Sequence, residues 1–301
     1  MQNRSPYLLL VLATLFWAGN FIIGRAIQAE IPPLTLSFWR LVTGFIFIIP
    51  FAYPYIKRDF PIILQNIKVL SLLTALGVVA FTACTYTALQ STTATNAVLL
   101  VSTSPVFIIL FSFVMFKTKV TFYQLMGVVL SLLGVVMIVS RGEWEVLKNL
   151  HLNIGDMWVM IAVITWALYS VFLRWKPQGI HWLSLLGTMI ALAVLMLFPL
   201  YLWESSGSRV WEINMTILSS LAYISLFPLI ISYMCWNQAV QEIGANTAGH
   251  FLHLIPAFGV ILSMIFLNER LASYHYLGIL AIFSGIYIAT IWKPKKLQVT
   301  A

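Results

Sequence analysis

Apolar and polar stretches alternate along the whole chain. Each apolar stretch holds about the 20 residues that an α-helix needs to cross roughly 30 Å of hydrocarbon. The pattern therefore predicts ten transmembrane helices, over residues 6–27, 33–53, 66–87, 94–116, 121–140, 155–175, 181–202, 213–236, 245–267 and 273–292.

The apolar pattern occurs twice in the chain. ATLFWAGNFIIGR (13–25) aligns with AVITWALYSVFLR (162–174), so that Trp17 matches Trp166 at a spacing of 149 positions. Further along, the spacing becomes 151 and persists through three helices, where Pro105 matches Pro256. Because each copy holds five helices, an odd number, the second copy enters the membrane from the opposite side. The sequence predicts an all-α integral membrane fold of two five-helix repeats with inverted topology.

Composition and charge agree with this fold. Hydrophobic residues make up 61% of the chain and charged residues 9%, whereas a soluble domain carries about a quarter charged residues. With the N-terminus in the cytoplasm, most Lys and Arg fall in inside loops, while Arg25 and Arg40 lie near helix ends on the outside. This positive-inside pattern predicts a multi-pass protein of the cell inner membrane with both termini cytoplasmic. The net charge of +8 is thus a topology signal, and nucleic acid is not an expected partner.

The duplication also gives domain boundaries. We assign residues 1–141 to the first repeat, 142–154 to an external linker, 155–293 to the second repeat and 294–301 to a short basic cytoplasmic tail. Two complete halves in one chain permit a functional monomer, and a dimer is not excluded.

Several stretches resemble a known family. The opening FWAGNFIIGR (16–25), PPLTLSFWR (32–40), and the run from Pro256 through NERL (268–271) to YLGILAIFSGIYI (276–288) are similar to the drug/metabolite transporter superfamily, EamA branch, across residues 6–292. Thr118 stands where the family often has a glutamate equivalent to Glu269. The resemblance implies a secondary transporter that moves a small metabolite, an amino acid or related compound, usually as an exporter. A broad-specificity drug or amphiphile exporter is the alternative.

The helix-breaking prolines Pro105 and Pro256 point to the binding site. Proline has no N–H and clashes with the carbonyl four residues earlier, which leaves the carbonyls of Val101 and Leu252 without helical donors. Such breaks are tolerated beside a water-filled cavity, and corresponding breaks in both halves indicate a transporter's binding site. A packed proline kink is the structural alternative.

Two histidines interrupt the apolar run HFLHLIPAFGVIL (250–262). His250 aligns with Leu99 and His253 with Ser102, so the shared scaffold requires neither. Ionisable groups inside a membrane are costly and are functional candidates. We expect at least one histidine to bind substrate or water. The alternatives are hydrogen bonds within the bundle or a metal site, for which a third and fourth ligand are missing.

Aromatic and amide side chains on other helices share the predicted interior face. Aromatic walls with a few placed amides suit a small amphipathic solute, although Trp and Tyr also serve as interfacial anchors. With the histidines, the predicted substrate-binding residues are Trp17, Asn20, Tyr86, Asn96, Trp166, Tyr169, Trp236 and Asn237.

The sequence offers little other chemistry. The acidic residues fall in loops or at helix ends on the predicted boundaries, and no Walker A, GxSxG or HExxH pattern occurs. We expect no cofactor, no metal and no catalytic residue. The rival class is a membrane-embedded enzyme that acts on a lipid-linked substrate with His250 as acid or base. The expected partners are a small-molecule substrate and the lipid bilayer.

Overall fold

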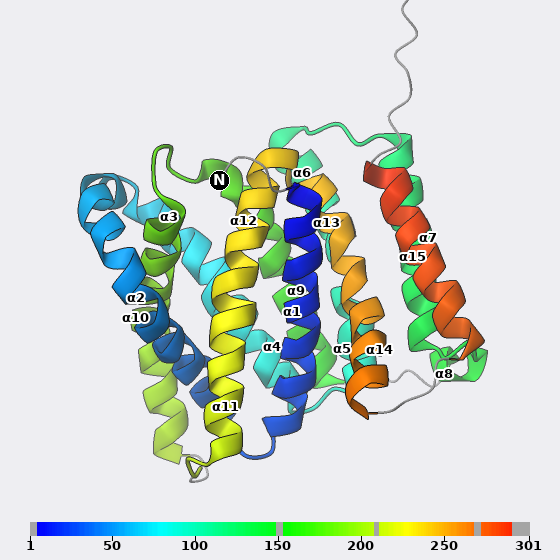
Figure 1. Cartoon of the computed structure of the whole chain (residues 1–301), viewed down its shortest axis with the longest axis horizontal. Helices are drawn as coiled ribbons and strands as arrows, with labels where there is room; N and C mark the ends of the chain where they lie inside the picture. The colour runs from blue at the N-terminus through cyan, green and yellow to red at the C-terminus, as the bar shows by residue number, and fades with distance from the viewer. Residues whose placement is uncertain (1–4, 149–152, 208–210, 268–271, 291–301) are drawn as a thin grey trace, which may run out of the picture.

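The computed structural model describes residues 5–148, 153–207, 211–267 and 272–290, and every regular element in these ranges is helical (Figure 1). Within them, ten helical spans are long and apolar enough to cross a membrane, which confirms the predicted number. In chain order the spans are α1 (Pro6–Ile27); α2 (Pro33–Gln65); α3 (Ile67–Thr74), η1 (Ala75–Ala80) and α4 (Phe81–Leu89); α5 (Ala94–Val101) and α6 (Ser104–Phe116); α7 (Phe122–Val139); α9 (Ile154–Phe172) and η2 (Leu173–Trp175); α10 (Trp182–Gly207); α11 (Met215–Ile224), η3 (Ser225–Ile231) and α12 (Ser232–Ile243); α13 (Ala245–Gly249), η4 (His250–His253) and α14 (Leu254–Leu267); and α15 (Ser273–Thr290).

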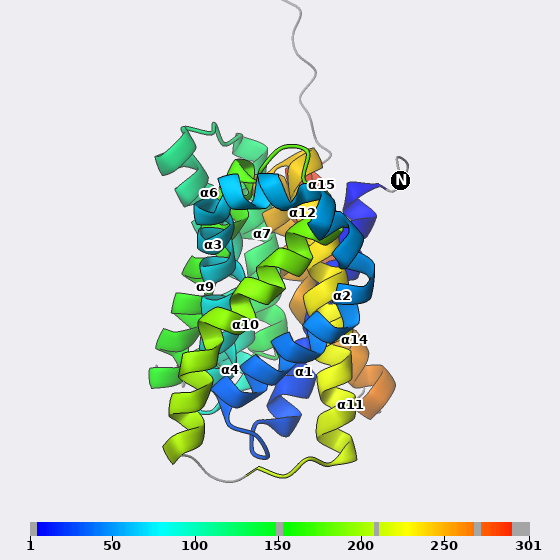
Figure 2. The same ribbon diagram turned by 90° about the vertical axis from the view of Figure 1, so that its left-hand side faces the viewer.

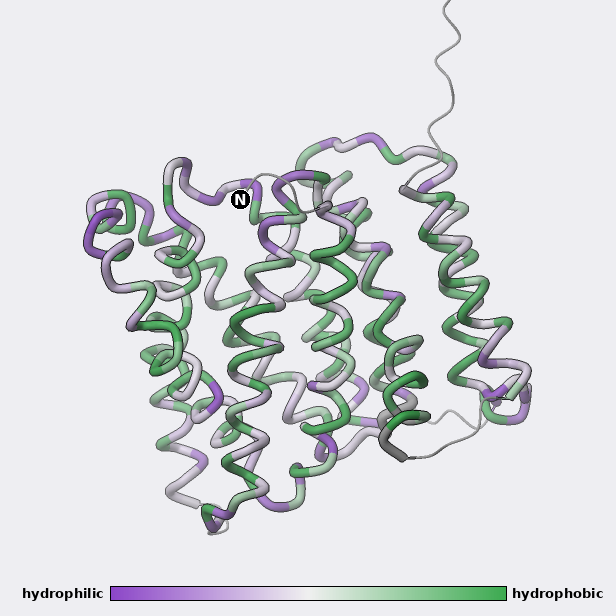
Figure 3. Tube along the Cα trace, in the orientation of Figure 1, coloured by the Kyte–Doolittle hydropathy of each residue, from purple (hydrophilic) through white to green (hydrophobic). Residues whose placement is uncertain are grey.

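The bundle has an apolar middle and polar ends. Hydrophobic residues dominate the middle of every span, and hydrophilic residues gather where spans join (Figure 3). Many large apolar side chains are exposed, including Ile46 at 60% and Phe51 at 67%, as expected of a surface that faces lipid. The short helix α8 (Trp144–Lys148) lies in the connection between the halves. The predicted basic tail, 294–301, falls outside the described residues.

The fifth and tenth spans pack as a pair that relates the two halves. α7 and α15 lie side by side (Figure 1), and Ser131 donates to the carbonyl of Ile282, its counterpart 151 positions later, at 3.3 Å. A Cβ built on Gly134 would lie 2.5 Å from the carbonyl oxygen of Gly278. Small residues therefore allow this close backbone approach, as is common between membrane helices.

The second span is longer than the sequence suggests. Its expected end at residue 53 is wrong, because α2 continues to Gln65 through Pro50, Pro54 and Pro61. Each proline removes one helical donor but does not end the helix, because α2 is held along its length against α10 (Figure 2). As a result, Asp59 lies inside a helix and not in a loop, where it is buried and accepts from the backbone N–H of His181 at 2.8 Å.

Both halves contain a π-helical turn at the same position. η1 in the third span and η3 in the eighth span are matched at the 151-residue spacing, so that Gly77 corresponds to Pro228. A π-helical turn frees backbone carbonyls and often marks a functional site. Here the carbonyl of Gly77 accepts from the hydroxyl of Tyr233, and the carbonyl of Pro228 accepts from Nε1 of Trp17 at 3.1 Å.

The fourth and ninth spans are interrupted beside their prolines. α5 ends at Val101, and α6 begins at Ser104 with Pro105 in its first turn. The freed carbonyl of Val101 accepts from the hydroxyl of Ser104 at 2.6 Å. In the ninth span the corresponding break is the 3₁₀ segment η4. Pro105 and Pro256 are both buried within the bundle and away from the lipid-facing surface.

Candidate functional site

An aromatic cluster occupies the centre of the bundle, where the first, sixth and eighth spans meet. The ring of Trp17 lies 5.0 Å from that of Trp166 and 5.5 Å from that of Trp236, measured between centroids. Tyr169 and Tyr233 complete the cluster at 5.3 and 5.5 Å from Trp166. All five side chains are buried, so they are interior groups and do not anchor the protein at the membrane interface.

A small cavity of about 20 Å³ adjoins this cluster. Several of its walls come in pairs related by the repeat, such as Val101 with Leu252 and Ser104 with Ile255, which places the cavity near the pseudo-two-fold axis between the halves. Its volume suits about one water molecule. We call it the central cavity; it is lined by Trp17, Asn20, Phe21, Arg40, Phe81, Val101, Ser104, Trp166, Leu252 and Ile255.

Arg40 is a wall of the central cavity that the sequence does not reveal. It lies about two turns from the start of α2, and its side chain is 2% exposed inside the bundle. Nε donates to the carbonyl of Ile224 at 3.1 Å, Nη1 to the hydroxyl of Thr82 at 3.4 Å, and the guanidinium lies 5.7 Å from the ring centroid of Tyr86. The seven positions between Pro33 and Arg40 correspond to about 10 Å of helix, a depth that could have drawn attention to this residue.

Two tyrosine–asparagine hydrogen bonds flank the cluster. The hydroxyl of Tyr86 donates to Oδ1 of Asn20 at 2.9 Å, and that of Tyr169 donates to Oδ1 of Asn237 at 2.6 Å. Asn20 corresponds to Tyr169 in the repeat, and Tyr86 corresponds to Asn237. Both halves thus have a Tyr–Asn hydrogen bond at this place, but the tyrosine and the asparagine occupy opposite positions of the pair.

The two histidines are buried and line neither the central cavity nor the larger cavity described below. Nε2 of His253 lies 2.8 Å from the carbonyl oxygen of Ser102, its own counterpart in the first half. Both ring nitrogens of His250 are buried without a hydrogen-bond partner among the described residues. In sequence, His250 lies one helical turn after Asn246, which lines the larger cavity, and two residues before Leu252, which lines the central cavity.

At one end the bundle is tightly closed. We call it the far end, because it is opposite the end where α1 begins (Figure 1). Nη1 of Arg25 donates to the carbonyls of Leu89 and Thr92 at 2.7 and 3.3 Å. The carboxylate of Asp156 accepts hydrogen bonds from the hydroxyl of Thr92 and from Nδ2 of Asn96. The distance from Asn96 Nδ2 to Asp156 Oδ2 is 3.2 Å. Asn96, predicted to bind substrate, therefore joins the fourth span to the start of the sixth at this end.

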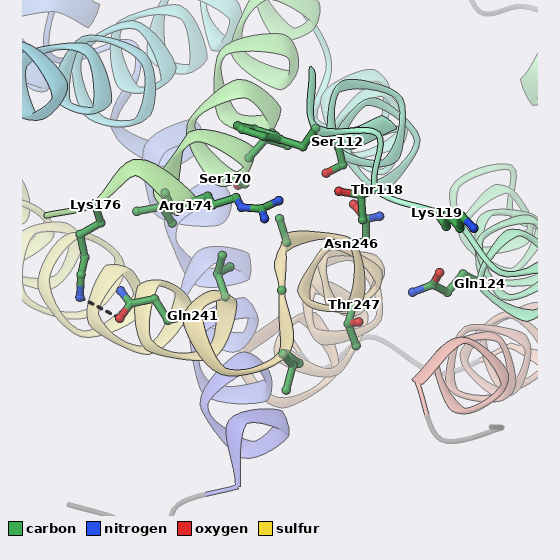
Figure 4. A pocket seen from close by; sticks show the side chains of 17 residues that line it. Ser112, Thr118, Lys119, Gln124, Ser170, Arg174, Lys176, Gln241, Asn246 and Thr247 are labelled. Atoms are coloured by element: carbon green, nitrogen blue, oxygen red, sulfur yellow. Dashed lines mark hydrogen bonds between the residues drawn. The ribbon is translucent and has the colours of Figure 1, made fainter. Parts of the chain in front are cut away.

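At the other end, where α1 begins, the bundle is hollow. A cavity of about 490 Å³, which we call the vestibule, separates the ends of the fourth, sixth and eighth spans (Figure 4). Arg174 projects from one wall toward Thr118 and Asn246 on the other (Figure 4). The vestibule is lined by Ser112, Phe116, Thr118, Lys119, Gln124, Ser170, Val171, Leu173, Arg174, Lys176, Val240, Gln241, Ile243, Gly244, Ala245, Asn246 and Thr247.

The vestibule and the closed end are counterparts in the repeat. Arg174 corresponds to Arg25, and Val240 and Ile243 correspond to Leu89 and Thr92. At the far end these positions are joined by hydrogen bonds, whereas in the vestibule the Arg174 guanidinium lies over the ring of Phe116, 5.2 Å from its centroid. The one side-chain bond drawn between vestibule residues joins Nζ of Lys176 to Oε1 of Gln241 at 2.8 Å (Figure 4). The same repeat positions therefore close the far end in the first half and line the open vestibule in the second half.

Comparisons with known proteins identify this architecture. The model of the EamA-like transporter family matches residues 4–140 and again 153–291. The chain belongs to the EamA-like transporter family. It is 30% identical over 291 residues to an "Uncharacterized transporter" of Archaeoglobus fulgidus, covering 96% of this chain and 98% of that one.

More distant similarities agree. "Uncharacterized transporter YetK" of Bacillus subtilis is 26% identical over 295 residues, covering 98% of this chain and 89% of that protein. A protein of known crystal structure has the same fold, with a TM-score of 0.73, 15% identity and coverage of 95% of this chain and 96% of that one.

Membership of the family makes the chain a multi-pass membrane transporter and not an enzyme. Among the described residues, no group of three or more His, Cys, Asp or Glu could hold a metal ion. Of the predicted site residues of this transporter, the structure brings Trp17, Asn20 and Trp166 to the central cavity. Tyr86 and Trp236 do not line it but contact its walls Asn20 and Trp166. Tyr169 contacts Trp166, and Asn237 lies one residue further out, bonded to Tyr169.

Proposed function

We propose that this transporter moves a small metabolite, an amino acid or a related compound, by alternating access across the cell inner membrane. The observation that carries the proposal is the contrast between the two ends. Corresponding residues close the far end and line an open vestibule at the other, around a central cavity near the axis that relates the halves. Exchange of these two arrangements would expose the central cavity to the opposite side.

The central cavity supports a small amphipathic cargo. Its walls combine indole and phenyl rings with the amide of Asn20 and the hydroxyl of Ser104, as small-molecule sites generally do. At about 20 Å³ the cavity is occluded, so a cargo enters only when the surrounding spans separate.

We further propose that the direction is export. Basic residues at the vestibule end favour its placement in the cytoplasm, so in export the vestibule is the side from which the cargo enters. In the same orientation both termini are cytoplasmic.

Transport by purified protein in proteoliposomes tests the proposal. We expect saturable flux of at least one radiolabelled amino acid, measured with and without an imposed pH or sodium gradient. Double substitution Arg25→Gln/Arg174→Gln removes both corresponding cations, weakens the closure of both ends and should lower this flux without abolishing it, in protein that remains folded. Flux of amphiphilic dyes without any amino acid would favour the broad-specificity exporter. Absence of flux for every amino acid in folded protein would contradict the proposal.

A further inference from the structure

Arg40 carries a positive charge that no Asp or Glu among the described residues pairs with. Arginine stays protonated in proteins, and a charge buried in a membrane bundle is costly unless it is paired. Its two hydrogen-bond acceptors, the carbonyl of Ile224 and the hydroxyl of Thr82, are neutral. In the part of the chain that the structure describes, the ion pairs of Asp and Glu are Arg58–Asp59 and Lys148–Glu145, and neither involves Arg40.

A scaffold role does not account for the charge. A neutral donor such as glutamine could bond one carbonyl and one hydroxyl. Positions 149 to 151 residues after Arg40 are Met189, Ile190 and Ala191, so the equivalent span of the second half forms without a cation. The first half alone contains this group, as expected of a residue that recognises a ligand.

The centre of the bundle also has an excess of hydrogen-bond donors. Nε1 of Trp166 and Nε1 of Trp236 are buried and have no acceptor in the described ranges of the chain. Trp166 lines the central cavity together with Arg40. A guanidinium and an unpaired indole N–H around one cavity call for a group that only accepts hydrogen bonds. An ionised carboxylate is such a group, and it matches the planar fork of arginine.

The route to the central cavity is also cationic. Lys119, Arg174 and Lys176 line the vestibule, and no Asp or Glu is among the described residues that line it. Ser112 and Ser104 lie on α6, and Ser170 and Trp166 on α9, so both helices run from the vestibule to the central cavity. A cleft lined by one sign of charge concentrates ligands of the opposite sign.

We propose that Arg40 binds the carboxylate of the transported molecule in the central cavity, with the apolar part of that molecule against Trp17, Phe81 and Trp166. This inference rests on the proposed function, since it names the group by which that cargo is recognised. It predicts that the substrates are carboxylates, which the protein binds more tightly than their amides and amines.

Matched ligands test the assignment directly. The probes are L-phenylalanine, L-leucine and L-threonine, each with its amide and its decarboxylated amine. Ligand-induced shifts in the unfolding temperature give relative affinities for the full-length protein, Arg40→Gln, Arg40→Lys and the control Lys148→Gln, which alters an exposed cation paired with Glu145. Flux in proteoliposomes is measured with the same set.

We expect wild-type protein and Lys148→Gln to prefer at least one carboxylate over its amide by about 10- to 100-fold, the range of charge-assisted hydrogen bonds. Arg40→Gln should lose this preference while its amide affinity stays within about twofold, and Arg40→Lys should fall between. If Arg40→Gln does not fold, the test rests on two results: the preference of the wild type for carboxylate over amide, and the partial loss of that preference in Arg40→Lys.

Equal affinity for acid and amide in the wild type, or an undiminished preference in Arg40→Gln, would overturn the inference. Flux of amines or neutral solutes that is unchanged in Arg40→Gln would also overturn the inference. In that case the protein would still be a transporter of small molecules. Carboxylate binding that depends on Arg40 but gives no flux would sustain the inference and contradict the proposed function.

Discussion

The two buried tyrosine–asparagine bonds show how the repeat works at the scale of single residues. Asn20 accepts from Tyr86 in the first half, and in the second half Tyr169 donates to Asn237. Each site needs one donor and one acceptor, and either span can supply either group. The interaction is therefore maintained even though residue-by-residue alignment pairs Asn20 with Tyr169.

Removal of one donor should have a measurable cost. Tyr169→Phe leaves Oδ1 of Asn237 without its partner, and we expect a loss of about 0.5–1.5 kcal/mol in stability, because interhelical hydrogen bonds in membranes are modest. Thermal unfolding in detergent measures the effect. Tyr276→Phe, on a side chain that is 61% exposed, is the control. Equal unfolding temperatures for the two variants would contradict the assignment.

The two histidines should respond differently to the same substitution. His253→Phe keeps a ring of similar size but removes the group beside the Ser102 carbonyl, whereas His250 has no partner to lose among the described residues. We expect His253→Phe to destabilise the protein by about 1 kcal/mol more than His250→Phe. Because His250 lies in sequence between Asn246, which lines the vestibule, and Leu252, which lines the central cavity, we expect His250→Phe to act mainly on substrate binding. Thermal unfolding and flux assays separate the two effects, and identical behaviour would show that the Ser102 contact adds no stability.

At the scale of elements, close packing of α7 and α15 depends on missing side chains. A Cβ on Gly134 would lie 2.5 Å from the Gly278 carbonyl oxygen, whereas one on Gly259 would meet nothing within 4 Å. We therefore expect Gly134→Ala to cost about 1–3 kcal/mol through overpacking. Gly259→Ala should be neutral or stabilising by up to about 1 kcal/mol, as expected in a helix interior. Unfolding temperatures compare the two, and a stable Gly134→Ala variant would refute tight α7–α15 packing.

The matched arginines at the span ends should control opposite states. In the open-vestibule structure Arg25 closes the far end through the Leu89 and Thr92 carbonyls. In the opposite state we expect Arg174 to donate to the corresponding carbonyls of Val240 and Ile243. Arg25→Gln should then shift the population away from the open vestibule by about 1.4 kcal/mol, or tenfold, and Arg174→Gln should not.

Thiol labelling measures this shift. Ser112 lines the vestibule, and Cys84 and Cys235 are buried, so the rate of labelling of Ser112→Cys reports opening. The rate should fall in Arg25→Gln and stay at or above the parent value in Arg174→Gln. A fall of the same size in both would show that the arginines do not act as opposing latches.

At the scale of the whole molecule, the even number of spans places the start of the first span and the end of the last span on one side. α1 begins and α15 ends at the vestibule end of the bundle (Figure 1). We expect this side to be cytoplasmic. In intact cells an impermeant thiol reagent should label Lys148→Cys, whose side chain is 56% exposed near the far end, and should not label Lys119→Cys in the vestibule until the membrane is opened. Labelling in the reverse order would invert the topology and the proposed direction of transport.

The sequence alone determined the local and periodic features of this protein. Apolar length fixes the ten spans because the bilayer has a fixed thickness, and an odd number of spans in each copy fixes the inversion. Proline chemistry marks the breaks near Pro105 and Pro256, since the lost donor is a property of the residue itself. Trp17 and Trp166 of the central cluster stand out in the sequence because both copies place a tryptophan at the same point.

Only the tertiary structure decided what depends on contacts between distant residues. Arg40 bonds the carbonyl of Ile224, 184 positions away, so its burial cannot be inferred from its neighbours in sequence. Asn96 lies at the closed end because it meets Asp156, 60 positions later. α2 extends past its prolines because α10 supports it. Which end is open also depends on tertiary contacts, because both ends carry a matched arginine, Arg25 and Arg174, and only the contacts that each one makes distinguish the closed end from the open end.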